Sequence, residues 1–142
     1  MRQNALASLR ENVADEWIAV IDDDDSVRHS LARILRSRGI RAQTFASAEE
    51  FLSRDNASEP CCLVVDVQLG GMSGFDLCDE MAARGDRAPP VVFMTAHDDI
   101  ASTHLAFRAG SSTYLRKPFY AEALLALVQP HLASTRFEQA GR

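Results

Sequence analysis

The chain has 142 residues, of which 46% are hydrophobic and 25% are charged, and its net charge is −5. This length supports one domain with a hydrophobic core and leaves little room for a second. The acidic balance argues against a nucleic-acid-binding domain, which would carry a basic face. No apolar run reaches the roughly 20 residues that a membrane span needs. Residues 1–16 also lack the apolar core of a signal peptide, so we expect a cytoplasmic protein with no membrane partner.

The hydrophobic pattern predicts five short strands that alternate with five helices. Residues 1–15 form an N-terminal extension, for which an amphipathic helix and a frayed arm both remain open. The strands are expected at residues 17–21, 40–45, 61–67, 91–95 and 112–115. The helices are expected at residues 26–38, 47–52, 75–84, 98–108 and 120–128. Residues 134–142 resemble a tail, so the predicted domain spans residues 16–133.

Short polar signals mark the expected helix starts. Asp25 or Ser26 is expected to cap the first of these helices. Ser47 and Glu50 have the spacing of a capping box, in which each side chain bonds the backbone N–H of the other residue. These signals place the polar segments between the strands and the helices.

The cysteines do not suggest a metal site. They are Cys61, Cys62 and Cys78. Zinc-binding spacing such as C-x-x-C is absent, and adjacent cysteines rarely pair with each other. We therefore expect three free thiols in packing positions.

Strands that alternate with helices predict an α/β fold, in which a parallel sheet has helices on both faces. Ligands of such sheets bind at the carboxyl ends of the strands. Polar residues follow or end four of the predicted strands: Asp22 and Asp23, Asp66, Thr95, and Lys117. Because these strand ends meet at one edge of the sheet, we expect a single site there.

Carboxylates dominate this predicted site. Residues 22–25 are four consecutive aspartates after the first strand, and Asp66 ends the third strand. Like charges brought this close raise at least one pKa, and a bound cation relieves the repulsion. Carboxylate oxygens suit the hard cation Mg²⁺. Asp24 and Asp25 are interpreted as turn and capping residues only.

Four segments together resemble the response-regulator receiver domain of two-component signalling. They are IDDDDSVR (21–28), LVVDVQLGGMSG (63–74), VVFMTA (91–96) and YLRKPF (114–119). The resemblance runs from about Trp17 to Leu132. It implies a doubly wound, flavodoxin-like (βα)5 fold with the strand order 2-1-3-4-5. The first segment and TFASAEEFL (44–52) are most similar to receivers that are joined to a helix-turn-helix output domain.

The resemblance also implies a phosphoacceptor and its metal ligands. Asp66 would accept a phosphoryl group from a histidine kinase and would bind Mg²⁺. Asp23 would bind Mg²⁺ directly, while Asp22 would hold a metal-bound water. The backbone carbonyl of Gln68 would complete the protein ligands.

Four further residues have implied roles around the phosphoryl group. Thr95 and Lys117 would contact its oxygens, where cationic and hydroxyl groups stabilise transferring charge. Pro118, after a cis peptide bond, would aim the lysine. Tyr114 would be the aromatic switch that moves into the space vacated by Thr95. The fourth helix, fifth strand and fifth helix would change their packing as a result.

The segment after Asp66 departs from the pattern of the family. Gly70 stands where the family usually has proline, and Gly70 and Gly71 together predict a flexible loop. We expect a less rigid Gln68 carbonyl and weaker Mg²⁺ binding or slower phosphorylation. Gln68 and His97 occupy the two variable positions that tune phosphoryl lifetime in relatives.

The implied function is a phosphorylation-switched signalling module with slow self-dephosphorylation as its only catalysis. Its donor would be a sensor histidine kinase or a phosphotransfer protein. Its output would be an unidentified downstream protein or a fused DNA-binding domain. Some members dimerise through the fourth helix, fifth strand and fifth helix, so a phosphorylation-dependent homodimer is one expected arrangement.

Two alternatives are open at this point. The first is a degenerate receiver that binds a partner without phosphorylation, although the complete set of acids, threonine and lysine argues against it. The second is a Mg²⁺-dependent phosphatase in which Asp22 and Asp24 act as nucleophile and acid. The length of the chain leaves no room for the cap insertion of such enzymes.

Overall fold

The computed structural model describes residues 16–55, 58–85, 89–95 and 113–133. In this part of the chain, five strands form one parallel sheet in the order β2-β1-β3-β4-β5. The strands are β1 (Ile18–Ile21), β2 (Ala42–Phe45), β3 (Cys62–Asp66), β4 (Val91–Thr95) and β5 (Thr113–Arg116). The sheet and its strand order confirm the predicted doubly wound (βα)5 fold.

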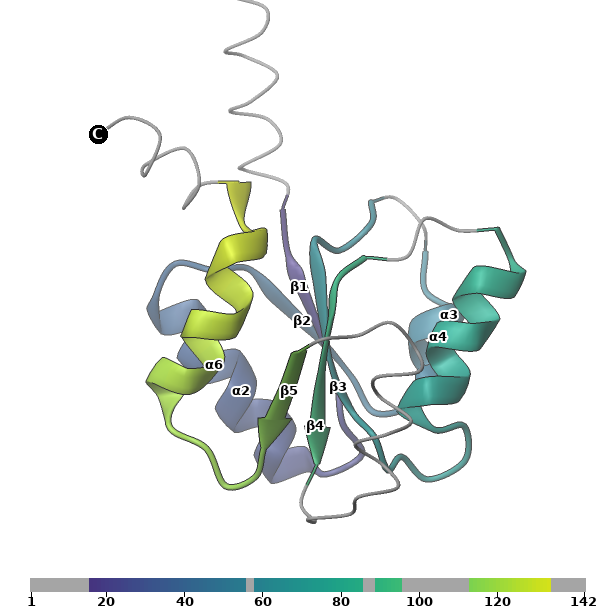
Figure 1. Cartoon of the computed structure of the whole chain (residues 1–142), viewed down its shortest axis with the longest axis horizontal. Helices are drawn as coiled ribbons and strands as arrows, with labels where there is room; N and C mark the ends of the chain where they lie inside the picture. Colours follow the sequence, from purple (N-terminus) through teal and green to yellow (C-terminus); the bar gives the residue numbers. More distant parts are fainter. Residues whose placement is uncertain (1–15, 56–57, 86–88, 96–112, 134–142) are drawn as a thin grey trace, which may run out of the picture.

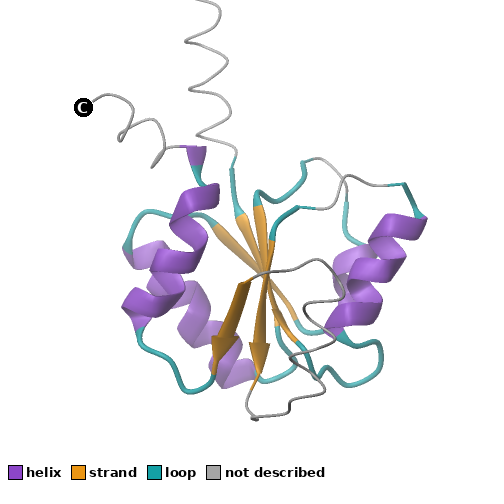
Figure 2. Cartoon of the chain, in the orientation of Figure 1, coloured by secondary structure: helices purple, strands orange, loops and turns teal. Residues whose placement is uncertain are grey.

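Helices cover both faces of the sheet (Figure 1). They are α2 (Asp25–Ser37), α3 (Ala48–Leu52), α4 (Gly74–Ala83), α6 (Ala121–Val128) and the short 3₁₀ helix η1 (Gln129–His131). Helices α2 and α6 lie on one face, and α3 and α4 lie on the other (Figure 2). The helix expected at residues 98–108 and the segments 1–15 and 134–142 lie outside the described residues. None of the described helices is long and apolar enough to cross a membrane.

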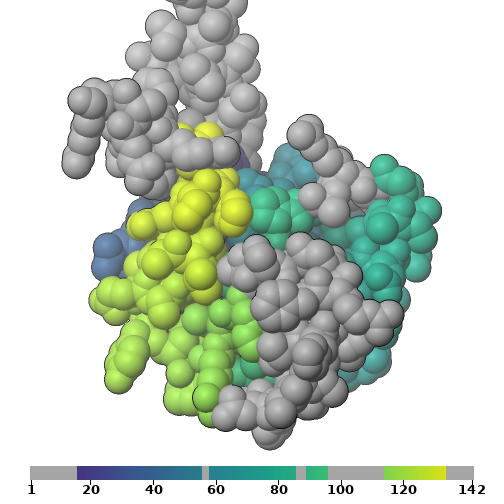
Figure 3. Space-filling model, in the orientation of Figure 1, coloured from purple at the N-terminus to yellow at the C-terminus, as the bar shows by residue number. Residues whose placement is uncertain are grey.

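Alternating strand residues divide the core into two clusters. Ile18 and Val20 of β1 pack with residues of α2 and α6, whereas Ala19 and Ile21 pack with residues of α3 and α4. Successive side chains of a strand point to opposite faces, so a strand covered on both sides must be apolar throughout. All residues of β1 and β3 are buried accordingly. In the space-filling view, residues 113–133, which include β5, α6 and η1, form one continuous surface on their side of the molecule (Figure 3).

The cap of α2 differs from the prediction. Asp24 is the N-cap residue, and its Oδ1 accepts hydrogen bonds from the backbone N–H groups of Ser26 at 2.8 Å and Val27 at 3.2 Å. The prediction of Asp25 or Ser26 was wrong because the helix begins one residue earlier. Asp25 instead lies in the first turn and forms an ion pair with Arg28.

The expected capping box is only half formed. The Ser47 hydroxyl accepts from the Glu50 N–H at 3.0 Å, as predicted. The Glu50 carboxylate, however, accepts from the Ala46 N–H at 2.9 Å and not from that of Ser47. The complete box lies at α4, where Ser73 and Asp76 bond each other's backbone N–H groups.

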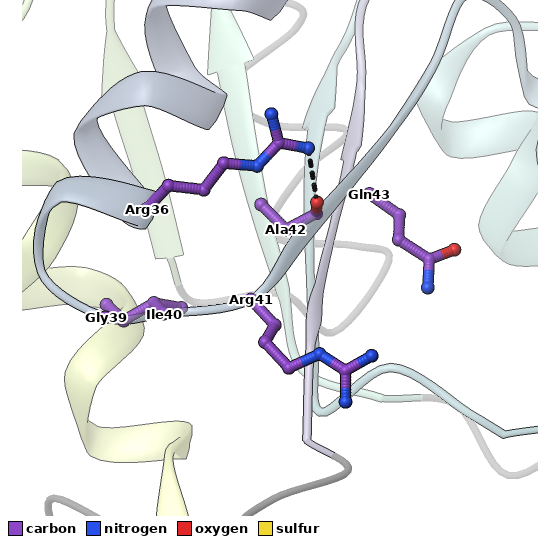
Figure 4. A pocket seen from close by; sticks show the side chains of 6 residues that line it. All are labelled: Arg36, Gly39, Ile40, Arg41, Ala42 and Gln43. Atoms are coloured by element: carbon purple, nitrogen blue, oxygen red, sulfur yellow. Dashed lines mark hydrogen bonds between the residues drawn. The ribbon is translucent and has the colours of Figure 1, made fainter.

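The open edge of the sheet is partly covered by an arginine. Strand β2 is one of the two edge strands of the described sheet, and the outward carbonyl of Ala42 accepts a hydrogen bond from Arg36 Nη2 at 2.8 Å (Figure 4). Arg36 and Ala42 line a shallow pocket of about 390 Å³, and Arg41 and Gln43 line it as well. Unpaired backbone groups on edge strands promote association between chains, so Arg36 satisfies a group that would otherwise be available for such pairing.

All three cysteines are free thiols, as expected. Burial, reinforced by the neighbouring Cys61, raises the pKa of Cys62 to about 12. Burial, reinforced by Asp79, raises the pKa of Cys78 to about 11. Both groups therefore remain protonated at neutral pH and act as packing residues.

The start of α4 packs directly beneath the third strand. Gly74 is buried and is the first residue of the helix, not part of the preceding loop as expected. A Cβ atom at this position would lie 2.7 Å from the Asp66 carbonyl oxygen and 3.0 Å from Val65 Cγ1. Only glycine lets α4 approach the end of β3 this closely.

The Gly74→Ala substitution is expected to lower the free energy of unfolding by about 1–3 kcal/mol, because the added methyl group overpacks this contact. Urea denaturation measures the change. Gly70→Ala is the matched control, since a Cβ there would meet only Asp23 Oδ2 at an ordinary 3.7 Å. Equal stability of the two variants would contradict the packing argument.

Candidate functional site

The carboxyl ends of the strands bring three distant charges together. Asp22 follows β1, Asp66 ends β3, and Lys117 follows β5. Lys117 Nζ donates hydrogen bonds to Asp22 Oδ2 at 2.9 Å and to Asp66 Oδ2 at 2.7 Å. The structure therefore assembles the predicted site around one ammonium group that is shared by two carboxylates.

The second oxygen of each carboxylate is held by the backbone. Asp22 Oδ1 accepts from the N–H of Asp24 at 2.9 Å, and Asp66 Oδ1 accepts from the N–H of Gln68 at 2.9 Å. In each case the carboxylate bonds the backbone N–H of the residue two positions later, and this bond closes a short turn. These turns and Lys117 together fix the orientation of both carboxylates before any ligand binds.

Burial and charge act in opposite directions on these groups. Burial of Asp22 raises its pKa, and the negative charge of Asp66 raises it further, although the Asp24 N–H and Lys117 partly offset the rise. Burial lowers the pKa of Lys117, but its bonds to Asp66 and Asp22 outweigh this effect and leave that pKa raised. Lys117 is therefore charged at neutral pH and is the internal counter-charge of the site.

Three carboxylates could hold a metal ion. Asp22, Asp23 and Asp66 each offer an oxygen atom, and these atoms lie within 4.8 Å of one another. Asp23 is exposed, whereas Asp22 and Asp66 are buried, so the cluster opens toward solvent on one side. Oxygen-only donors of high negative charge fit Mg²⁺ better than they fit zinc or copper.

Thr95 and Lys117 are tied to each other through the backbone. Thr95 is buried at the last position of β4, and its carbonyl accepts from the Lys117 N–H at 2.7 Å. The peptide bond between Lys117 and Pro118 is cis, as the resemblance implied. The ends of β4 and β5 thus place Thr95 and the Lys117 ammonium group at the same edge of the sheet as Asp66.

Tyr114 packs against the end of the third strand. It is half-buried on β5, opposite Phe93 of β4, and belongs to a small apolar cluster with Phe93 and Val67. Val67 directly follows Asp66, and its N–H donates to the Met94 carbonyl at 2.9 Å. His97 lies outside the described residues.

Two contributors to the site were not predicted. Arg28 Nη1 donates to the carbonyl of Asp22 at 2.8 Å and holds the turn after β1. Glu49 of α3 accepts a hydrogen bond from the Met72 N–H at 3.0 Å, in the loop after β3. The Glu49 contact has no short-range sequence signature, since Glu49 and Met72 are 23 positions apart. The sequence contains a single lysine, Lys117, and it lies in this site.

The family model for the response regulator receiver domain matches residues 18–129. The chain belongs to this family. It is 39% identical over 115 residues to the transcriptional regulatory protein FixJ of Azorhizobium caulinodans, covering 81% of this chain and 54% of that protein. It is 40% identical over 111 residues to nodulation protein W of Bradyrhizobium diazoefficiens, covering 78% and 48%. This receiver domain therefore spans about half the length of these curated relatives.

Solved receiver structures share the fold. The response regulator StyR is 39% identical with a TM-score of 0.73, covering 89% of this chain and 64% of that one. A response regulator receiver protein from Burkholderia phymatum is 40% identical with a TM-score of 0.72, covering 83% and 95%. The BeF3-activated receiver domain of DrrB is 33% identical with a TM-score of 0.71, covering 82% and 97%.

The geometry counts against the phosphatase alternative. That mechanism needs Asp24 as an acid beside Asp22. The Asp24 carboxylate instead caps α2 through its bonds to Ser26 and Val27, and its side chain is not among the clustered metal-ligating acids. The receiver reading, which uses Asp24 only as a cap, agrees with these contacts.

The rate at which Lys117 is acylated should show whether its ammonium group is paired with Asp22 and Asp66. A raised pKa and partial burial both slow the reaction of an amine, so Lys117 should react at least about tenfold more slowly at pH 8 in the native protein than in the urea-unfolded chain. Peptide mapping after treatment with an N-hydroxysuccinimide ester measures the rate at this single lysine. Asp66→Asn should speed the native reaction, and equal rates in native and unfolded protein would contradict the described ion pairs.

Proposed function

We propose that Asp66 is the phosphoacceptor of this receiver domain and that a phosphohistidine is the donor. The observation that carries the proposal is the position of Asp66. Its carboxylate meets Lys117 on one oxygen and belongs to a three-acid cluster. At 8% exposure for the residue, it is mostly buried but open to a docked donor.

The reaction transfers one phosphoryl group. A carboxylate oxygen of Asp66 attacks the phosphorus atom, and the bond from phosphorus to the imidazole nitrogen of the donor breaks. The nitrogen keeps the electron pair of that bond, and Asp66 becomes an acyl phosphate. Lys117 and Thr95 contact the phosphoryl oxygens in this proposal, where positive charge and hydrogen bonds stabilise the transferring group. Slow hydrolysis of the acyl phosphate resets the domain.

Asp22, Asp23, Asp66 and the Gln68 carbonyl would hold Mg²⁺. When bound, Mg²⁺ supplies positive charge that neutralises the acids and the phosphoryl oxygens. The positive charge of the ion would stabilise the charged form of Asp22, which is fully buried and faces Asp66 across Lys117. Lys117 then has two tasks: it balances the acids in the metal-free protein and turns toward the phosphoryl group in the modified one.

Phosphorylation would reach the surface through the apolar cluster beside Asp66. A phosphoryl group adds about −1.5 to −2 charges and would draw Thr95 and Lys117 toward residue 66. Tyr114 would then repack against Val67 and Phe93, with which it already shares a cluster. Because β5 and α6 adjoin Tyr114, this is a shift between two packings of one fold, which a partner can read.

The partners follow from the family and remain part of the proposal. The donor is a sensor histidine kinase or a phosphotransfer protein. The output is a downstream protein or a fused DNA-binding domain, and the transcriptional names of relatives such as FixJ favour the second. A phosphorylation-dependent homodimer through β5 and α6 is a further arrangement to test.

Acetyl phosphate with Mg²⁺ should add the mass of one phosphoryl group to the protein, and Asp66→Asn should abolish the addition. Intact-mass spectrometry measures the product, and EDTA should prevent it. Asp24→Asn is the matched control, since it removes a neighbouring charge while keeping a good N-cap residue. Normal modification of the Asp66→Asn protein, or loss in Asp24→Asn alone, would show that the assignment is wrong.

A degenerate receiver would give a different result in the same experiment. It would gain no mass in any variant and would bind its partner equally well with and without the phosphoryl donor. The described structure favours a receiver that is phosphorylated over a degenerate one. The residues that phosphorylation would need all lie at one edge of the sheet: Asp22, Asp23, Asp66, Thr95 and Lys117.

A further inference from the structure

The loop between β3 and α4 has few attachments in its middle. Its start is fixed by the bonds from Val67 to Met94 and from Gln68 to Asp66, and its end by the capping box of α4. Residues 69–72 between these points include Gly70 and Gly71, which place few limits on the backbone. Within the described part of the chain, a single hydrogen bond holds residues 69–72 to another element.

Glu49 makes that bond. Its Oε1 accepts from the Met72 N–H at 3.0 Å, and the same oxygen would lie 3.4 Å from a Cβ atom at Gly71. Gly71 has a φ angle of +102°, which other residues rarely adopt. Leu69 and Met72 add apolar contacts to the core that α3 also joins. The hydrogen bond that holds residues 69–72 therefore comes from one carboxylate, that of Glu49 on α3.

The fastened segment lies against the acidic site. A Cβ atom at Gly70 would lie 3.7 Å from Asp23 Oδ2. Gln68, two positions earlier, donates its N–H to Asp66 and offers the carbonyl assigned to Mg²⁺ above. The Gln68 carbonyl lies on the loop side of the two bonds that fix Val67 and Gln68. A loop that moves away from α3 would therefore shift this carbonyl relative to the three carboxylates.

We propose that Glu49 is a positioning residue that holds the β3–α4 loop, and with it the Gln68 carbonyl, in the arrangement that binds Mg²⁺. Glu49 touches neither the ion nor the phosphoryl group in this role. Gly70 and Gly71 make the backbone of the loop flexible. The charge-assisted hydrogen bond from the Met72 N–H to the Glu49 carboxylate compensates for this flexibility. This inference rests on the proposed function, and it assigns to α3 a part in preparing the site.

Two measurements on Glu49→Ala test the proposal. Amide hydrogen exchange of the metal-free protein should be faster at Met72, because its acceptor is gone. Titration calorimetry should show a Mg²⁺ dissociation constant raised about three- to tenfold, as expected for loss of one hydrogen bond. Glu49→Gln should largely restore both values, since its side-chain oxygen still accepts the bond.

Glu50→Ala is the matched control. It removes a carboxylate from the same turn of α3, but that group bonds the Ala46 N–H and not the loop. It should therefore leave Met72 exchange and Mg²⁺ affinity near the wild-type values. A general loss of stability in α3 would affect both alanine variants alike, whereas the proposed role affects only Glu49→Ala.

The outcomes separate this inference from the function on which it rests. If the wild-type protein neither binds Mg²⁺ nor accepts a phosphoryl group, the proposed function is wrong. If the wild-type protein does both and Glu49→Ala has unchanged Mg²⁺ affinity, the function stands and the positioning role of Glu49 is wrong. Faster Met72 exchange without a change in affinity would likewise overturn the role.

Discussion

The ammonium group of Lys117, shared by Asp22 and Asp66, is the interaction on which the site depends. A parallel sheet brings the carboxyl ends of its strands to one edge, and here two of those ends carry buried acids. Their repulsion would favour protonation or movement apart. The bonds of 2.9 Å and 2.7 Å to Lys117 hold both acids close together and oriented. The same arrangement leaves a negative surplus with Asp23 that suits a divalent cation.

Backbone contacts turn this charge cluster into a defined geometry. The Asp24 and Gln68 N–H groups each hold one carboxylate oxygen, and the Thr95 carbonyl holds the backbone of Lys117. Glu49 extends this support to the loop after β3. The site is therefore organised in two layers: charged groups that meet the ligand, and surrounding bonds that determine where those groups lie.

The apolar side of the site links it to the rest of the domain. Val67, Phe93 and Tyr114 form a cluster that begins one residue after the proposed phosphoacceptor and reaches the outer strand β5. Tyr114 is only half-buried, so this cluster reaches the surface at β5. A change of charge at Asp66 therefore has a short route to β5 and α6. The matched segment covers only about half of the curated relatives FixJ and nodulation protein W, whose remaining residues have no counterpart in that match.

The residue pattern predicted the five strands and their parallel sheet, whereas the family resemblance supplied the strand order and the expected roles of the site residues. Apolar runs that end in acids predict buried parallel strands, and the combined segments identify the family, because both signals are local in the chain. Only the tertiary structure decided that Asp24 caps α2, that Gly74 belongs to α4, and that Glu49 meets Met72. Helix ends differ by one residue with little change in local energy, so neighbouring contacts select among them. The bond from Glu49 joins segments that no periodicity connects, and it exists only because α3 and the loop pack on the same face of the sheet.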